Sequence, residues 1–411
     1  MRILTEQADR LNDEGDFAGA AQLLRKARVR AAHVPAETYA LLGMQEIYAY
    51  IRADQPDAAI PSLGALADAG FRLPGNLEAM AGFDRLLGDQ RADAAMATIR
   101  GHADRYRAAH SDPGSAPLVF EDVPRFWAAY DLASETRGDR AKAAIFRRHY
   151  LAPGTPGLVG YHWLKTGTAE ALVRRITSSP EYYDGIRERT LAAATFEPTI
   201  RAGLHRFKAL YPGAYFPPVT FVIGRLNSGG TAGPEGLMIG LDVWGWSEGV
   251  STEGLSDGLV KLVRSTDMSQ LPMIVVHEQI HSLQEYGTDQ TLLMGVLQEG
   301  TADFLAHLAL PDQERPPYYH WGIANEERIW HRLQAEMDSE DWSDWIGNNG
   351  SEIAKGWHAD AGYFIGSRIA QAYYERAGNK QQAIVDLLSV TDPHAVLERS
   401  GYAGKGSRYG E

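Results

Sequence analysis

The N-terminal 105 residues carry short apolar stripes at helical spacing, separated by polar turns. The segments 13–27 and 53–71 share one pattern, in which a turn is followed by an Ala-Ala pair and then by leucines. The two Ala-Ala pairs lie 38 residues apart, close to the period of helical-hairpin repeats. The pattern predicts an α-helical, tetratricopeptide-like region at 1–105, and a generic helical bundle is the alternative. Two repeats bury little apolar surface, so we expect this region to pack on the following domain.

The remainder of the chain, residues 110–411, combines a few strand patterns with many helical ones. Pro, Gly and Ser are concentrated at 110–126, which predicts a linker followed by the first strand. Apolar and β-branched runs predict further strands at 219–224 and 236–245, joined by a turn at 225–233. We expect the later strand to form the edge of the sheet. The predicted fold class is therefore α+β and helix-rich, with a small sheet, preceded by a helical domain.

Composition excludes several classes of protein and site. The chain is 44% hydrophobic and 23% charged, which is ordinary for a globular protein of more than one domain. Its net charge of −13 makes nucleic acid or an anionic membrane surface an unfavourable partner. No transmembrane helix is expected, and residues 1–16 lack the basic segment and apolar core of a signal peptide, which leaves the compartment open. Because there is no cysteine, any metal must be held by His, Asp or Glu.

The stretch HEQIH, residues 277–281, is the strongest chemical signal. On a helix, residues i and i+4 share a face, so His277 and His281 can present two imidazoles to one Zn²⁺ ion. Glu278 lies beside that metal, where a carboxylate can hold and deprotonate a bound water. The apolar run MIVV before the motif predicts a largely buried helix, as a shaped metal cavity requires. A chance match or a solvated helix face is the alternative.

A third zinc ligand is expected on the following helix. Glu299 lies 18 residues after His281, and Asp303 follows one turn later on the same helix face. Glu299 would complete the ligand set, and Asp303 would accept the free N–H of a ligand histidine and so set its tautomer. His307 is a rival third ligand, although the rise of the helix carries it far from Glu299. Surface acids or salt-bridge partners are the ordinary alternative for both carboxylates.

Several stretches together resemble one family. HEQIH, LQEGTADFLAHLAL, WHADAGYFIGSRIAQAYYE and the terminal SGY are similar to the predicted zinc-dependent proteases that share a domain of unknown function numbered 2268. The resemblance covers residues 110–402 and leaves out the N-terminal helices. It implies a gluzincin-like metallopeptidase domain, with Zn²⁺ held by His277, His281 and Glu299 and with Glu278 as the general base.

A gluzincin also needs a donor for the oxyanion besides the metal. The stretch GWHADAGYFIG offers Tyr363 and His358, and Tyr363 is preferred because small residues beside it allow close approach. Tyr363 could instead be a core aromatic, and His358 a surface or capping residue. His320 is a further candidate, and Asp360 is expected to cap the helix that follows it.

The predicted function is zinc-dependent hydrolysis of peptide bonds, in which Glu278 takes a proton from the metal-bound water. The expected partner is a peptide or protein substrate, and the N-terminal helices offer a surface for a protein partner. Two alternatives stay open. One is a metallopeptidase-like binding scaffold with weak or no hydrolysis, and the other is a zinc hydrolase of a non-peptide amide.

Overall fold

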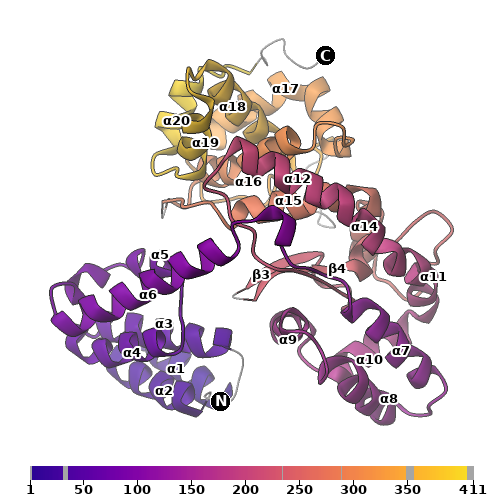
Figure 1. The fold of residues 1–411 in the computed structure, drawn as a ribbon, viewed down its shortest axis with the longest axis horizontal. Coiled ribbons are helices and arrows are strands. Elements are labelled where there is room, and N and C mark those ends of the chain that lie inside the picture. Colours follow the sequence, from indigo (N-terminus) through magenta and orange to yellow (C-terminus); the bar gives the residue numbers. More distant parts are fainter. Residues whose placement is uncertain (1, 31–35, 234, 288, 349–355, 405–411) are drawn as a thin grey trace. The chain divides into compact units, whose positions relative to one another are not determined.

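The computed structural model describes residues 2–30, 36–233, 235–287, 289–348 and 356–404 of the 411-residue chain. The chain divides into two compact units, Met1–Ser111 and Asp112–Glu411 (Figure 1). The helix-rich α+β class predicted from the sequence is confirmed, because a four-stranded sheet lies among many helices. None of the described helices is long and apolar enough to cross a membrane.

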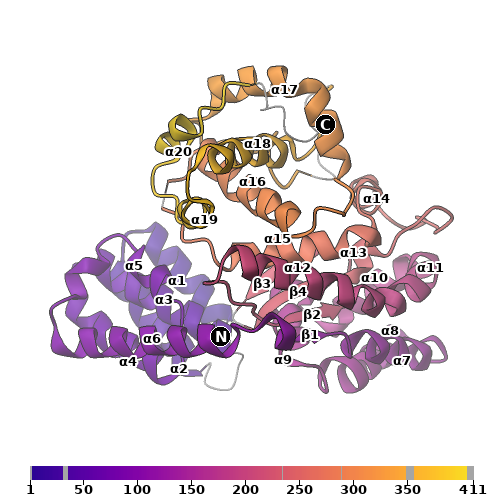
Figure 2. The same ribbon diagram turned by 45° about the horizontal axis from the view of Figure 1, so that its top comes forward.

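In the first unit, amphipathic helices pack against their neighbours in chain order (Figures 1 and 2). They are α1 (Arg2–Asp13), α2 (Phe17–Arg30), α3 (Ala36–Arg52), α4 (Pro56–Asp68), α5 (Pro74–Glu78) and α6 (Gln90–Ala109). The small residues Ala20, Ala21 and Ala59 are fully buried, which lets neighbouring helices approach closely. Leucines and other apolar side chains then fill a core that belongs to this unit alone.

A buried ion pair also ties three of these helices together. Nε of Arg28 in α2 lies 2.7 Å from Oε2 of Glu46 in α3, and both side chains are almost completely buried. The hydroxyl of Ser62 in α4 donates to the other oxygen of Glu46 at 2.5 Å. Removing one partner of such a pair leaves an uncompensated buried charge, at a cost of about 3–5 kcal/mol. The pair therefore favours one mutual arrangement of α2, α3 and α4.

In the second unit, helices surround the sheet. Before the main strands lie α7 (Asp122–Ser134), α8 (Asp139–Phe146), α9 (Pro156–Tyr161), α10 (Ala169–Ser178), α11 (Pro180–Leu191) and α12 (Glu197–Leu210). After them lie α13 (Leu241–Trp244), α14 (Asp257–Arg264), α15 (Leu271–His281), α16 (Leu292–Ala309), α17 (Pro317–Glu336), α18 (Ala361–Arg376), α19 (Lys380–Leu388) and α20 (Pro393–Ser400). One continuous hydrophobic core joins the two groups of helices.

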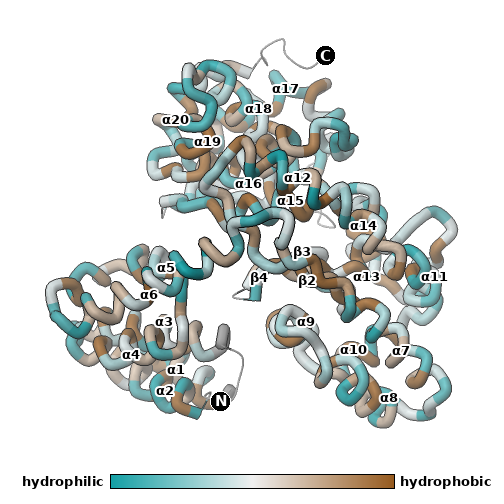
Figure 3. The backbone as a smooth tube through the Cα atoms, in the orientation of Figure 1, coloured by the Kyte–Doolittle hydropathy of each residue, from teal (hydrophilic) through white to brown (hydrophobic). Residues whose placement is uncertain are grey.

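The sheet has the strand order β1-β2-β4-β3. The strands β1 (Leu118–Val119), β2 (Val219–Val222) and β4 (Gly236–Gly240) are parallel, and β3 (Gly230–Gly233) is antiparallel to β4. Both β2 and β4 are buried along their whole length. That burial explains their continuous apolar sequences. Figure 3 shows that most residues of β2 are hydrophobic.

Two features of the sheet differ from the prediction. The predicted turn at 225–233 contains the strand β3, whose sequence GTAG has little preference for a strand and pairs because β4 offers it a partner. As a result β4 lies inside the sheet and β3 forms the edge, so the expected edge strand was wrong. The predicted strand at 236–245 also ends early, at Gly240, where α13 begins.

A buried carboxylate in α13, Asp242, holds the segment that follows β2. Its two oxygens accept the backbone N–H groups of Gly224 at 2.8 Å and Leu226 at 2.6 Å. Leu226 has a φ of 60°, a left-handed conformation that is unfavourable for a residue with a side chain. Burial raises the pKa of Asp242 to about 6, although the hydrogen bonds from Gly224 and Leu226 oppose this shift. The carboxylate therefore stabilises a strained segment while its own charge is unfavourably buried.

Replacing Asp242 with Asn should destabilise the second unit, because one of the two amides then faces an N–H₂ group instead of an acceptor. The expected loss is about 1–3 kcal/mol of unfolding free energy. The folded-state pKa lies above the unfolded value, so the stabilisation from protonating Asp242 is present below about pH 4. It is lost as the pH rises through about 6. The stability difference between wild type and variant should therefore shrink between about pH 4.5 and about pH 7.5.

All nine tryptophans lie in the second unit, so urea unfolding followed by tryptophan fluorescence reports on this unit alone. The measurement is made on wild type and on Asp242→Asn at both pH values. A stability difference that is the same at both would contradict the raised pKa, and no difference at either would contradict the role of the two hydrogen bonds.

Candidate metal centre

Two adjacent helices, α15 and α16, carry the residues of the candidate metal centre (Figure 2). Pro272 lies in the first turn of α15. Backbone N–H groups in a first turn have no partner within the helix, so proline loses no hydrogen bond there. The buried Gln279 donates to the carbonyl of Pro217 at 2.8 Å and so anchors α15 to the segment before β2. The hydroxyl of Thr291 accepts the N–H of Met294 and caps α16. These contacts orient the facing sides of the two helices.

Three side-chain atoms converge between these helices. Nε2 of His277 and Nε2 of His281 lie 2.9 Å apart, and Oε2 of Glu299 lies 3.4 Å from the first and 3.2 Å from the second. A tetrahedral zinc ion with bonds of about 2.0–2.1 Å places its ligand atoms roughly 3.3 Å apart. The observed separations therefore fit one shared zinc ion. Among the described residues, no other group of three or more side chains has the geometry to hold a metal.

Hydrogen bonds orient both imidazole rings. Nδ1 of His277 lies 2.8 Å from Oδ1 of Asp303, whose other oxygen accepts the hydroxyl of Tyr318. Nδ1 of His281 lies 2.6 Å from Oε1 of Gln284, whose amide N–H₂ donates to a backbone carbonyl of α16 at 2.7 Å. Carboxylate and amide oxygens only accept, so each ring carries its proton on Nδ1. Both Nε2 atoms then face the point that they share with Glu299, and each offers a lone pair there when its ring is neutral.

The electrostatics of the cluster favour a cation at this point. Burial lowers the pKa of His277, but hydrogen bonds to Asp303 and Glu299 outweigh burial and raise that pKa well above its usual range. Burial likewise lowers the pKa of His281, and Glu299 raises it overall. Burial raises the pKa of Glu299, but the two histidines hold it well below the usual range. Protons on the imidazoles or a metal ion can supply the positive charge that these carboxylates attract.

A cavity of about 380 Å³ lies beside the cluster and is lined by His277, Glu278, Tyr363 and His358, among others. The ring of Tyr363 is stacked on that of His277, with 5.9 Å between the ring centroids. Within the described part of the chain, the side chains of Glu278 and Tyr363 have no hydrogen-bond partner. Burial raises the pKa of Tyr363 well above its usual range, so its hydroxyl stays a donor. His358 is bound through Nδ1 to the carbonyl of Ala359 at 2.7 Å.

The other candidate residues lie outside the ligand set. His307 lines the cavity beside Tyr319, with ring centroids 6.4 Å apart, and burial lowers its pKa to about 4. The rival role of third ligand is therefore wrong for His307. His320 is exposed and does not line the cavity. Asp360 occupies the cap position of α18, but its side chain makes no capping hydrogen bond, so that expectation was also wrong.

Two residues that orient the candidate ligands, Gln284 and Tyr318, were not predicted from the sequence. Gln284 lies three residues after His281, just past the end of α15, where a polar side chain can reach back to the last turn. That spacing was a usable signal. Tyr318 reaches Asp303 only because the start of α17 folds against α16, and the sequence carries no local sign of this contact.

The position of Glu299 depends on the residue that follows it. At Gly300, α16 crosses α18 so closely that an added Cβ would overlap the backbone of Gly366 and Ser367. At Gly366, an added Cβ would overlap the carbonyl of Val296. The crossing is therefore a direct contact between two backbones, and it places Glu299 at the cluster.

Gly300→Ala should destabilise the second unit by about 1–3 kcal/mol or more, because neither backbone can yield to the added methyl group. Gly378→Ala is the matched control, since nothing lies within 4 Å of a Cβ at that position. Both variants are compared with wild type by urea unfolding and tryptophan fluorescence. Equal stability of the two variants would show that the crossing has room to adjust.

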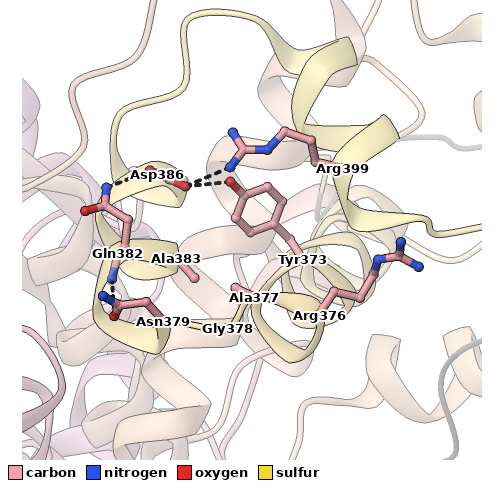
Figure 4. A pocket seen from close by; sticks show the side chains of 9 residues that line it. All are labelled: Tyr373, Arg376, Ala377, Gly378, Asn379, Gln382, Ala383, Asp386 and Arg399. Atoms are coloured by element: carbon pink, nitrogen blue, oxygen red, sulfur yellow. Dashed lines mark hydrogen bonds and ion pairs between the residues drawn. The ribbon is translucent and has the colours of Figure 1, made fainter.

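A second hollow, of about 420 Å³, is lined by residues of α18, α19 and α20 (Figure 4). Its central carboxylate, Asp386, accepts hydrogen bonds from Tyr373 at 2.6 Å, from Gln382 at 2.9 Å and from Arg399 at 3.1 Å. Figure 4 shows the side chain of Arg376 pointing away from this network. The polar groups of the network pair with each other, so this hollow gives no indication of a ligand.

Comparison with protein families identifies a relationship for the second unit. A family model described as gliding motility protein GldB matches residues 165–404, more than half of the chain. The matched segment contains β2, β3 and β4 and all the residues of the metal cluster. The comparisons with curated proteins and with solved structures give no significant match.

This match overturns the resemblance to zinc-dependent proteases. The assignments that depended on it are also wrong: the peptidase function, the enzyme class and the gluzincin type. The physical reason is that an H-E-x-x-H helix followed by a glutamate specifies the atoms around a metal, and such an arrangement does not by itself specify a reaction. The tetratricopeptide-like pattern at 1–105 lies outside the matched segment and stays a prediction.

Proposed function

Because the chain belongs to the family of the gliding motility protein GldB, we propose that it is a zinc-dependent binding protein with a non-proteolytic role in motility. The observation that carries the proposal is the convergence of His277, His281 and Glu299 on one point, with both rings oriented through Nδ1. Two buried imidazoles that turn their lone pairs toward a carboxylate need a cation between them.

The ligand types favour zinc over other common metals. Calcium and magnesium prefer oxygen ligands, whereas two of these three ligand atoms are imidazole nitrogens. The separations of 2.9–3.4 Å fit tetrahedral coordination, which zinc adopts readily. Copper binds such ligands more tightly in general but favours square-planar or tetragonal sites.

Three protein ligands leave a coordination position for another group. The adjacent cavity gives a ligand access to His277, and the free hydroxyl of Tyr363 lies on the same wall as a donor. When bound, zinc supplies an electron-pair acceptor that holds such a ligand. In this role the site binds and orients a group of a partner, and no bond is broken.

Purified protein should hold about one zinc ion per chain, measured by mass spectrometry of the metal after dialysis against metal-free buffer. His281→Ala removes one of three ligands and should lose the zinc. Asp303→Asn keeps the ligands but removes the charge behind His277, so zinc affinity should drop by about 10–100-fold in a chelator competition.

His307→Ala is the matched control, because His307 lines the same cavity without contributing a ligand atom. It should bind zinc as wild type does. Full zinc content in His281→Ala would show that the ligand set is wrong, and equal loss in His307→Ala would show that the loss is not specific. Turnover of a peptide library by the zinc-loaded protein would contradict the non-proteolytic role.

The motility role is tested by placing the same two substitutions in the gene of the source organism. The strain with His281→Ala should spread less on a surface than wild type, because the protein is present but has no metal to hold its ligand. The strain with His307→Ala should spread normally. Immunoblotting establishes equal amounts of protein in both strains, and normal spreading of the His281→Ala strain would argue against a role of the metal in motility.

A further inference from the structure

We propose that the cavity beside the metal cluster binds a small organic acid with two carboxylates and an apolar body, one carboxylate at the metal and the other at Arg315. This inference rests on the proposed zinc site and names the class of ligand that the site serves. It is carried by the contacts of Arg315, by the lining of the cavity and by the size of the cavity.

Arg315 lines the cavity as a half-buried cation without a counter-ion. Its guanidinium carbon lies 3.9 Å from the ring centroid of Tyr319. It makes no hydrogen bond or ion pair with any residue that the structure describes. The tyrosine ring covers one face of the guanidinium and takes none of its N–H groups, which lie in the guanidinium plane. The N–H edge therefore remains available for a planar carboxylate, which such an edge binds through two parallel hydrogen bonds.

Two half-buried arginines near the cavity-forming helices, Arg368 and Arg332, are paired with carboxylates. Nε of Arg368 lies 2.8 Å from Oε1 of Glu326. Arg332 pairs with Glu336 at 2.8 Å and with Asp344 at 2.6 Å. Arg315 differs from these two arginines, because no carboxylate of the described residues forms an ion pair with it, and it differs from other unpaired half-buried arginines because it lines the cavity beside the metal cluster.

Four acidic residues line the cavity, Glu278, Asp303, Glu314 and Asp360, and none forms an ion pair with Arg315 within the described part of the chain. Asp303 is engaged on both oxygens, by His277 and by Tyr318. Glu314 immediately precedes Arg315 in the chain, but its side chain is exposed to solvent. Burial lowers the pKa of Arg315, and the nearby charge of Asp303 opposes this shift without reversing it. An anionic ligand would relieve the cost of that burial.

The rest of the cavity favours an apolar body. Met273 and Ile274 lie four and three residues before His277 in α15, so all three share one helix face toward the cavity. Trp244 adds a large aromatic side chain to the lining. The volume of about 380 Å³ suits a small organic molecule, since sites for small ligands begin at roughly 300 Å³.

Isothermal titration calorimetry on the zinc-loaded full chain tests the assignment with two probes. Benzylsuccinate carries two carboxylates on an aromatic body, and 3-phenylpropanoate carries one. Arg315→Gln should weaken the binding of benzylsuccinate by roughly 10–100-fold, as expected for loss of a charge-assisted hydrogen-bond pair. It should leave 3-phenylpropanoate, whose single carboxylate takes the metal, within about threefold of its wild-type affinity. Arg315→Lys, which keeps the charge without the planar edge, should fall between wild type and Arg315→Gln.

Arg264→Gln is the control for charge alone, because Arg264 is an exposed cation that lines the same cavity. It should bind benzylsuccinate as wild type does, and an equal loss in both glutamine variants would overturn the pairing with Arg315. Zinc content and thermal unfolding of each variant show whether the site and the fold are intact. If wild type holds zinc and Arg315→Gln binds benzylsuccinate unchanged, this inference alone fails. If wild type holds no zinc, the proposed function fails and this inference with it.

Discussion

The backbone contact between α16 and α18 is the constraint on which the candidate site depends. Gly300 and Gly366 bring the two helices together without side chains between them. Glu299 precedes Gly300, Asp303 lies one turn after Glu299, and Tyr363 lies one turn before Gly366. One crossing therefore places three groups: a candidate metal ligand, the carboxylate that orients a second candidate ligand, and a hydroxyl that lines the cavity. Any side chain at the crossing would move these three groups together.

The two units show opposite solutions to the burial of charge. In the first unit, Arg28 and Glu46 form a buried pair that is complete in itself. In the second unit, Glu299 faces the Nε2 atoms of two imidazoles whose Nδ1 atoms are bound to Asp303 and Gln284. The positive charge that this arrangement attracts comes from protons on the imidazoles or from a metal ion at the shared point. The first network is closed by its own charges, whereas the second has the geometry to hold a metal ion.

Local geometry explains which parts of the site could be predicted. The spacing of His277 and His281 is a property of one helix, and the spacing of Glu299 and Asp303 is a property of the next, so both were readable from the chain. The contact of Tyr318 with Asp303 depends on where the start of α17 meets α16, which periodicity does not encode. The contact of Gln284 with His281 is local, three residues apart, and was overlooked although the chain carries it. The strand β3 was not predicted, because its sequence GTAG has little preference for a strand and is extended only by pairing with β4. The helix-rich α+β class was readable because it depends on many periodic segments at once.

The error in function has a different origin from the error in the sheet. The motif and the glutamate after it describe a metal environment, and a metal environment is shared by proteins that hydrolyse and proteins that bind. Hydrolysis further requires that a scissile bond be held at the metal and that its leaving group be protonated. The spacing of His277, His281 and Glu299 indicates neither the binding of a scissile bond nor the protonation of a leaving group. The unpaired Arg315 on the same cavity is a feature of a binding site in its own right, because an anion held at that point gains a charge partner whether or not a reaction follows.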